Sequence, residues 1–317
     1  MCVGGDQENT IEVTAIWCKH DFVLEEDRQN KYIIKFAKID GSDILEGESL
    51  LRTSEDVQGE NTSFIEGFHI PKVIIRDDDN LLRFCIQGMC SDGTYLYYKI
   101  TKLDEEGRDE LVKYNLKTGE SISVDGEKYG HGNDLTYNKN TGMLYMVDAT
   151  SSKIYIIRAD TLESVETVEL SSLVDGGNVA SIAYNEKANQ YVLVGGIYYT
   201  EENNTVGWTY PYIYLVDENF QLIKKFHLEN DYNAYQGIDC DGDYIYLAKV
   251  DLTTNVRGEY VFIYDMGGNY IDKIECNYFK EIEGIQRVGD VFYLAYANKY
   301  YGGYILETIP IKTKRLM

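Results

Sequence analysis

An internal repeat constrains this chain more than any other feature of its sequence. Five segments open with a polar or small pair followed by an aliphatic residue, and the middle residues of these triplets are 46, 47, 56 and 47 residues apart. The triplets are Gln87-Gly88-Met89, Asn133-Asp134-Leu135, Ala180-Ser181-Ile182, Gln236-Gly237-Ile238 and Glu283-Gly284-Ile285. A unit of this length cannot bury its own faces, so the repeats must pack against one another.

Each repeat predicts four short strands. A Tyr-rich or aliphatic second strand follows every triplet, and Asp92-Gly93, Thr141-Gly142 and Asp241-Gly242 supply the intervening turns. The second strands are Tyr95–Tyr98, Leu144–Val147, Tyr191–Val194, Tyr244–Leu247 and Phe292–Ala295. Four short strands in about 47 residues are typical of a β-propeller blade. The sequence therefore predicts an all-β chain in which residues 72–317 form a five-bladed β-propeller, with blades opening near 87, 133, 180, 236 and 283.

The two ends of the repeat region predict how the ring closes. The fifth repeat lacks a clear fourth strand, and Lys72–Ile75 lies before Gln87 at the distance where the other repeats carry theirs. This N-terminal strand is expected to complete the last blade. Residues 1–71 do not repeat and are interpreted as an N-terminal β-extension with candidate strands at Thr10–Cys18 and Tyr32–Ile39. A sixth, degenerate blade is the alternative.

The composition limits the classes of partner that the chain could bind. The net charge of −23 disfavours nucleic acid and anionic membranes, whereas it tolerates cationic partners or metal ions. The 29 tyrosines agree with β-structure. The six cysteines form no CxxC pair and no zinc spacing, so free, mostly buried thiols are expected and no metal site is predicted from them.

The N-terminus leaves the location open. The sequence contains no apolar stretch of membrane-spanning length and no signal peptide. Cys2, followed by small and polar residues, looks like the start of a mature bacterial lipoprotein, which would place the chain at the cell surface. The alternative is a cytoplasmic or virion protein that begins at its natural Met1.

The candidate site lies where the chain enters the first strands. On that side of a propeller the loops between second and third strands also emerge, and here these loops are long, which marks the face for recognition. Polar residues converge on the central channel at this face, where they could bind a small polar ligand or, as a further alternative, a divalent cation. The other interpretation is a water-filled channel whose polar groups satisfy one another. The set is Gln87, Asn133, Asp134, Tyr235, Gln236 and Glu283.

His131 is the strongest single candidate. It lies between Gly130 and Gly132, a pair that lets the backbone approach a ligand. If the protein is an enzyme, His131 and Glu283 are the expected acid and base. The loop of the third blade adds Tyr199, Trp208 and Tyr210 for stacking on a carbohydrate or peptide, or for packing on a neighbouring blade.

One acidic segment looks like a metal-binding motif. Asp239–Asp243 resembles a calcium loop, but it lacks the distal Glu and falls on a strand turn at the opposite face. It is not expected to bind calcium.

Two resemblances add to this interpretation. The opening Cys85-Ile86-Gln87-Gly88-Met89 with Tyr95-Leu96-Tyr97 resembles the first blade of glutaminyl cyclotransferases of the plant and bacterial type. Of that family's acidic catalytic positions, the resemblance implies a counterpart here only at Glu283. The phrase from His131 to Asn138 is similar to propeller modules on surface proteins of Gram-positive bacteria, a resemblance that implies no reaction. Low Pro and high Tyr, Asn and Ile content fits an AT-rich bacterium or its phage.

These observations favour a non-enzymatic recognition propeller that binds a glycan, peptide or partner protein through its long loops and needs no cofactor. The alternatives are an enzyme with cyclotransferase, lactonase or lyase chemistry at the central channel, and a structural component of a bacterial surface or phage assembly.

Overall fold

The structure is a computed structural model of the 317-residue chain. It describes residues 2–3, 11–12, 63–68, 71–77, 84–102, 105, 107–174, 177–196, 198–200, 206–208, 212–228, 234–251, 258–276, 281–297 and 303–314. Across these ranges the regular structure is β-strand, apart from the single 3-10 turn η1 (Glu127–Tyr129). No helix in these ranges is long and apolar enough to span a membrane.

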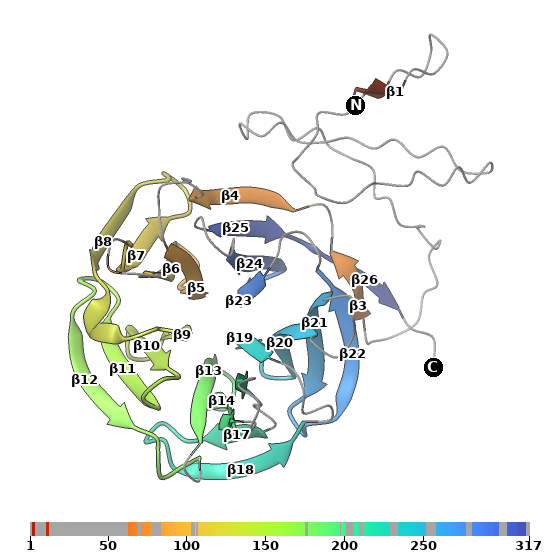
Figure 1. Ribbon diagram of the computed structural model, residues 1–317. Helices are drawn as coiled ribbons and strands as arrows, with labels where there is room; N and C mark the ends of the chain where they lie inside the picture. Colours follow the sequence, from red (N-terminus) through yellow and green to blue (C-terminus); the bar gives the residue numbers. More distant parts are fainter. Residues whose placement is uncertain are drawn as a thin grey trace.

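Five antiparallel sheets of four strands each stand around a common axis (Figure 1). In every sheet the strands follow one another from the axis outward in chain order, except that the last sheet ends on a strand from the N-terminal side. Blade 1 consists of β5 (Phe84–Ser91), β6 (Tyr95–Lys102), β7 (Glu110–Asn115) and β8 (Ser121–Asp125); blade 2 of β9 (Asp134–Asn138), β10 (Met143–Asp148), β11 (Lys153–Arg158) and β12 (Ser164–Glu169). Blade 3 consists of β13 (Asn178–Asn185), β14 (Gln190–Gly196), β17 (Tyr212–Val216) and β18 (Leu222–His227); blade 4 of β19 (Ala234–Cys240), β20 (Tyr244–Asp251), β21 (Gly258–Asp265) and β22 (Tyr270–Glu275). Blade 5 consists of β23 (Glu281–Val288), β24 (Val291–Ala297), β25 (Gly303–Thr308) and β4 (Lys72–Asp77). The chain is a five-bladed β-propeller, as its repeats predict.

The N-terminal strand closes the ring. β4 pairs with β25 in an antiparallel register that places Val73 opposite Leu306 and Ile75 opposite Ile305. This arrangement confirms the predicted closure, and it joins the last blade to chain that precedes the first (Figure 1). In a propeller closed in this way, the fifth sheet is complete only when β4, which precedes blade 1, has paired with β25 of blade 5.

Beyond the blades, β3 (Ser63–Phe68) pairs with β26 (Pro310–Lys314). Phe68 packs on Phe292 of blade 5, with ring centroids 5.2 Å apart. The short β1 (Cys2–Val3) pairs with β2 (Ile11–Glu12), which falls within the expected strand at Thr10–Cys18. The expected strand at Tyr32–Ile39 lies outside the described residues, and the division at residue 71 stays a prediction.

The hydrophobic core lies between neighbouring blades. At the junction of blades 1 and 2, Cys90 and Tyr97 pack with Leu135 and Leu144, and all four are buried. Many tyrosines fill such junctions because the long ring spans the gap while the hydroxyl reaches a backbone carbonyl. The Tyr296 hydroxyl, for example, donates to the carbonyl oxygen of Cys276 at 2.7 Å. The described cysteines Cys85, Cys90, Cys240 and Cys276 are free, and three of them are buried, as expected.

The outermost strands are exposed, and their edges are irregular. In four of the five blades a register shift interrupts the pairing of the fourth strand with the third. Such bulges twist an edge and discourage pairing with another chain.

At the axis the innermost strands approach too closely for side chains. A Cβ atom on Gly88 would lie 2.2 Å from the Asp134 Cα, and one on Gly237 would lie 2.6 Å from the Gly284 Cα. This crowding confirms the reason expected for small middle residues in the triplets.

A hydrogen bond joins the innermost strands at each of the five junctions. The bonds are Gly88 N to Asn133 O (3.0 Å), Tyr184 N to Thr136 Oγ1 (3.0 Å), Ser181 Oγ to Gln236 O (2.9 Å), Arg287 N to Asp239 Oδ2 (2.6 Å) and Ser91 N to Gln286 Oε1 (3.2 Å). In three of them the acceptor side chain stands two residues after the middle of its triplet, as in Thr136, Asp239 and Gln286. The repeat therefore specifies contacts between blades as well as within them.

Candidate functional site

The two ends of the propeller differ in loop length. On the side we call the loop face, the chain enters the first strands and connects second strands to third strands; on the opposite side, the turn face, short turns connect first strands to second. The loop-face connections run from Lys102 to Glu110 in blade 1, from Gly196 to Tyr212 in blade 3, from Asp251 to Gly258 in blade 4 and from Ala297 to Gly303 in blade 5. The turn-face connection of blade 5 spans only Val288 to Val291.

Asp134 forms the floor beneath the loop face. Its side chain is fully buried, and Oδ2 accepts the backbone N–H groups of Ile182 and Ile238, both at 3.1 Å. Oδ1 accepts the N–H of Leu135 at 3.0 Å. Burial raises the pKa of Asp134 well above that of a solvated carboxyl, while the three N–H donors act in the opposite direction. One carboxyl group thus connects the inner strands of blades 2, 3 and 4.

The His131 loop is held by its backbone. Thr101 Oγ1 donates to the His131 carbonyl oxygen at 2.6 Å, and the His131 N–H donates to Asp148 Oδ1 at 3.3 Å. The flanking Gly130 and Gly132 have φ values of 63° and 62°, a region that disfavours other residues. Burial and the positive charge of Lys99 lower the pKa of His131, so its imidazole is neutral at pH 7.

The His131 loop passes directly over the buried side chain of Lys99. Its side chain is completely buried, and Nζ donates to Asp109 Oδ1 at 2.5 Å, to the Ile100 carbonyl oxygen at 2.8 Å and to Thr101 Oγ1 at 3.1 Å. A Cβ on Gly132 would lie 2.7 Å from the Lys99 Cγ, so only glycine lets the loop pass over the lysine stem. Burial lowers the pKa of Lys99, and the Asp109 carboxylate opposes that shift.

A second polar group gathers from blades 1 and 5. Gln87 and Glu283 are both buried, and the Gln87 side-chain Nε2 lies 3.1 Å from Cys85 Sγ. Burial, reinforced by the negative charge of Glu283, raises the pKa of Cys85 to about 12. The structure therefore brings Gln87 and Glu283 near one thiol, and it keeps that thiol protonated.

The remaining predicted residues have other surroundings. The Asn133 side-chain oxygen accepts the Ala149 N–H at 3.0 Å, so this amide is used within blade 2. The Gln236 carbonyl oxygen accepts the Ser181 hydroxyl. The side chains of Tyr235, Tyr199 and Trp208 lie outside the described residues, as does Tyr210. On the backbone, β15 (Tyr198–Thr200) and β16 (Val206–Trp208) pair as a small hairpin within the blade 3 loop.

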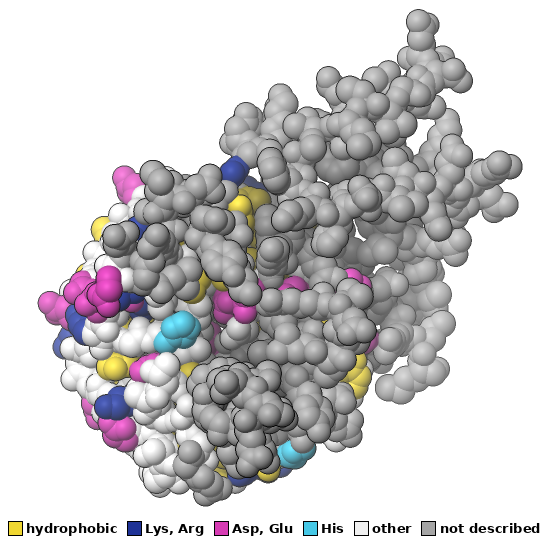
Figure 2. All heavy atoms as spheres, in the orientation of Figure 1, with side chains coloured by type: hydrophobic (Ala, Val, Ile, Leu, Met, Phe, Trp, Pro, Cys, Tyr) yellow, Lys and Arg dark blue, Asp and Glu magenta, His cyan; other side chains and the backbone are white. Residues whose placement is uncertain are grey.

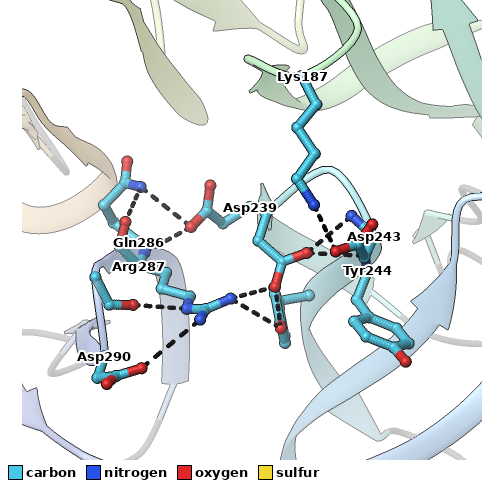
Figure 3. Close-up of polar contacts among 10 residues, drawn as sticks. Lys187, Asp239, Asp243, Tyr244, Gln286, Arg287 and Asp290 are labelled. Carbon is cyan, nitrogen blue, oxygen red and sulfur yellow. Dashed lines mark hydrogen bonds and ion pairs between the residues drawn. The ribbon is translucent and has the colours of Figure 1, made fainter. Parts of the chain in front are cut away.

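The calcium-like segment has another use on the turn face (Figure 3). Asp241 Oδ1 accepts two turn N–H groups and Oδ2 accepts the Tyr246 hydroxyl at 2.7 Å, while its carboxylate pairs with Arg287 of blade 5. Asp243 pairs with Lys187 of blade 3 at 2.5 Å. These carboxylates therefore join three blades. Through all the ranges that the structure describes, no three His, Cys, Asp or Glu side chains are grouped so that they could hold a metal ion.

Three residues of the network around the His131 loop, Lys99, Asp109 and Asp148, were not predicted from the sequence. Lys99 carried a signal, because it is the one charge within the apolar run from Tyr95 to Ile100. A lysine there must either face solvent or find a buried partner. Asp109 and Asp148 lie in loops, where acidic residues are common, so their roles depend on the folded arrangement.

The chain matches no protein-family profile and no curated protein. Solved structures with a similar shape include glutaminyl cyclase from Myxococcus xanthus (11% identity over 77% of this chain and 97% of that chain, TM-score 0.49) and a tail fiber of Staphylococcus aureus phage P68 (16% identity, 76% and 52%, TM-score 0.49). Regucalcin from Agrobacterium tumefaciens, described as a calcium-binding protein, is 14% identical over 79% of this chain and 96% of that chain, with a TM-score of 0.46. These similarities are limited to the shape of the fold and identify no activity.

Proposed function

We propose that the protein is a recognition propeller that binds a glycan, a peptide or a protein partner on its loop face, without catalysing a reaction. The observation that carries this proposal is that the polar side chains of that face hydrogen-bond to one another and to the backbone of its loops. Lys99, Asp109 and Thr101 hold the His131 loop, and Asp148 holds the same loop from the other side.

Asp148 illustrates the point. Its Oδ1 also accepts the N–H and the hydroxyl of Thr150, and its Oδ2 accepts the Ser151 hydroxyl at 2.5 Å. A carboxylate that accepts this many hydrogen bonds fixes the positions of the neighbouring loop residues. Such a network supports a rigid platform, which favours binding because little order has to be gained when the partner arrives.

The floor and the rim agree with a surface site. Asp134 links the inner strands of blades 2, 3 and 4 beneath the loop face, which supports a firm base for a ligand bound there. Basic and acidic side chains are interspersed on the left side of the view in Figure 2. Lys102 at the end of β6 pairs with Glu127 of η1. This mixed charge suits a polar, largely uncharged partner better than a strongly cationic one.

The test is binding of the purified chain to glycan and peptide arrays, followed by titration of each hit with two variants. Trp208→Ala should weaken binding about tenfold or more, since a stacking aromatic at an interface contributes on this scale. Tyr270→Ala removes an aromatic residue that is 44% exposed on the outer strand β22, and should leave binding unchanged. Equal effects of the two variants, or chemical conversion of a hit by the wild type that His131→Ala abolishes, would overturn the proposal.

A further inference from the structure

The turn face carries a cleft between blades 1 and 2, far from the loops discussed above. Its volume is about 310 Å³, near the lower limit of small-molecule pockets. Blade 1 contributes Asp92, Tyr97 and Lys113, while blade 2 contributes Tyr137, Met143, Arg158 and Asp160 among others. The cleft thus combines two cations and two carboxylates with aromatic and thioether surface.

The repeat supplies an internal comparison at the junction of blades 4 and 5. Asp92 and Asp241 each lie four residues after the middle of their triplet, and each accepts a tyrosine hydroxyl from the second strand, Tyr97 and Tyr246 respectively. The next blade then differs. At blades 4 and 5 the third residue after the middle is Arg287, which pairs with Asp241. At blades 1 and 2 the same position is Tyr137, whose ring stacks on Tyr97 at 6.4 Å.

The third strands differ as well. Ile263 lies opposite Tyr246 in blade 4, whereas Lys113 lies opposite Tyr97 in blade 1. Lys113 Nζ donates to the Ala159 carbonyl oxygen at 2.9 Å and lies 4.3 Å above the Tyr95 ring. Those contacts occupy one of its three protons and fix the position of the ammonium group. Blade 1 therefore places a positioned cation where blade 4 has an apolar side chain.

Arg158 provides a second cation at the same cleft. It is exposed at the end of β11, and the described residues give neither Arg158 nor Lys113 a carboxylate partner. By contrast, the cations Lys187 and Arg287 of the cleft between blades 4 and 5 are both paired. The two carboxylates of the cleft are oriented by other donors: Asp92 accepts the N–H groups of Thr94 and Tyr95 and the hydroxyl of Tyr97. Asp160 Oδ1 accepts the Thr161 N–H at 2.9 Å.

We propose that this cleft binds a small organic carboxylate, with the carboxylate group held by Lys113 and Arg158 and an apolar body packed on Tyr137 and Met143. A guanidinium fork matches a carboxylate in a planar, bidentate manner. The half-buried Tyr137 and Met143 offer the apolar surface that a bare inorganic anion would not use. The site lies on the face opposite the proposed recognition surface and is independent of it.

The test uses the full-length chain and three probes followed by NMR titration: benzoate, benzamide and inorganic phosphate. Benzoate should bind, and benzamide and phosphate should each bind at least about tenfold more weakly, because one lacks the charge and the other the apolar body. Arg158→Gln should weaken benzoate about tenfold, and Lys113→Met should do so while keeping the stem that covers Tyr95.

Lys117→Gln is the matched control, since it removes the same charge from an exposed turn outside the cleft. It should leave benzoate affinity unchanged. Absence of benzoate binding at millimolar concentration, equal binding of benzamide or phosphate, or equal losses in Arg158→Gln and Lys117→Gln would each overturn the proposal. Arg158 is exposed, so its substitution tests binding even if Lys113→Met fails to fold.

Discussion

The carboxylate of Asp134 accepts the backbone N–H of Ile238, a residue 104 positions later in the chain, at 3.1 Å. The same oxygen accepts the N–H of Ile182 at 3.1 Å. The bond reaches past the adjacent blade 3 to blade 4, so it can form only when blades 2, 3 and 4 are assembled around the axis. Asp134 therefore reports on the packing of three blades in a way that contacts within one blade do not.

We expect Asp134→Asn to destabilise the fold by about 2 kcal/mol, because either orientation of the amide points an NH2 group at a backbone N–H donor. The free energy of unfolding from urea titration measures the loss. Glu166→Gln on the exposed strand β12 makes the same chemical change without a buried partner and should cost less than about 0.5 kcal/mol. Equal stabilities of the two variants would show that the axial carboxyl contributes nothing.

Gly88→Ala should be far more damaging than a glycine substitution in a turn. The new Cβ would lie 2.2 Å from the Asp134 Cα, and backbone there cannot move without separating two blades. A loss above about 3 kcal/mol is expected from such overpacking. Gly142→Ala is the control, because no atom lies within 4 Å of the added carbon. Its φ is 70°, so the substitution should lower the free energy of unfolding by about 1 kcal/mol, through the left-handed backbone conformation alone. Similar losses in both would contradict the crowding.

The sequence was sufficient to predict the propeller because its signals are local and repeated. The triplets, the Tyr-rich second strands and the Asp92-Gly93 type of turn each specify structure within about ten residues, and five copies reinforce one another. Even the closing strand at Lys72 could be predicted, because a blade without a fourth strand leaves a ladder unpaired.

The roles of individual polar residues were harder to predict. Asp134 was expected to face a ligand beside the channel, whereas its oxygens accept N–H groups from residues 48 and 104 positions away. Spacing along one repeat does not reveal which neighbouring backbone a carboxylate will reach. Aligning the repeats would have found part of the answer, because Thr136, Asp239 and Gln286 share one position and each accepts an N–H of the next blade.

Ring closure by β4 predicts a contrast between two neighbouring residues. Ile75 is 7% exposed and packs in the core between blades 5 and 1, while Val73 on the same strand is 42% exposed. Ile75→Ala should cost about 2–4 kcal/mol, and Val73→Ala should fall within about 0.5 kcal/mol of the wild type. Urea denaturation measures both. If the two substitutions cost the same, β4 does not seal the last blade as described.

Asp239 predicts how stability depends on pH. Burial raises the pKa of its carboxyl from 3.8 to about 7, although the N–H of Arg287 and the Gln286 amide donate to Oδ2 at 2.6 and 3.1 Å. Between pH 3.8 and about pH 7, the carboxyl of Asp239 keeps its proton in the folded chain but has released it in the unfolded chain. The stability that this proton contributes is therefore complete below about pH 4 and is lost as the pH rises to about 7.

Asp239→Asn removes that titration and keeps an oxygen for the Arg287 N–H. The free energy of unfolding of the wild type minus that of the variant should fall steadily from pH 4 to pH 7 and stay level above it, when both are measured by urea titration at half-unit steps. Glu166→Gln should track the wild type over the same range, since that carboxylate is exposed. A difference that is flat or rises with pH would mean that Asp239 is already ionised in the folded chain at pH 4, with the N–H donors outweighing burial.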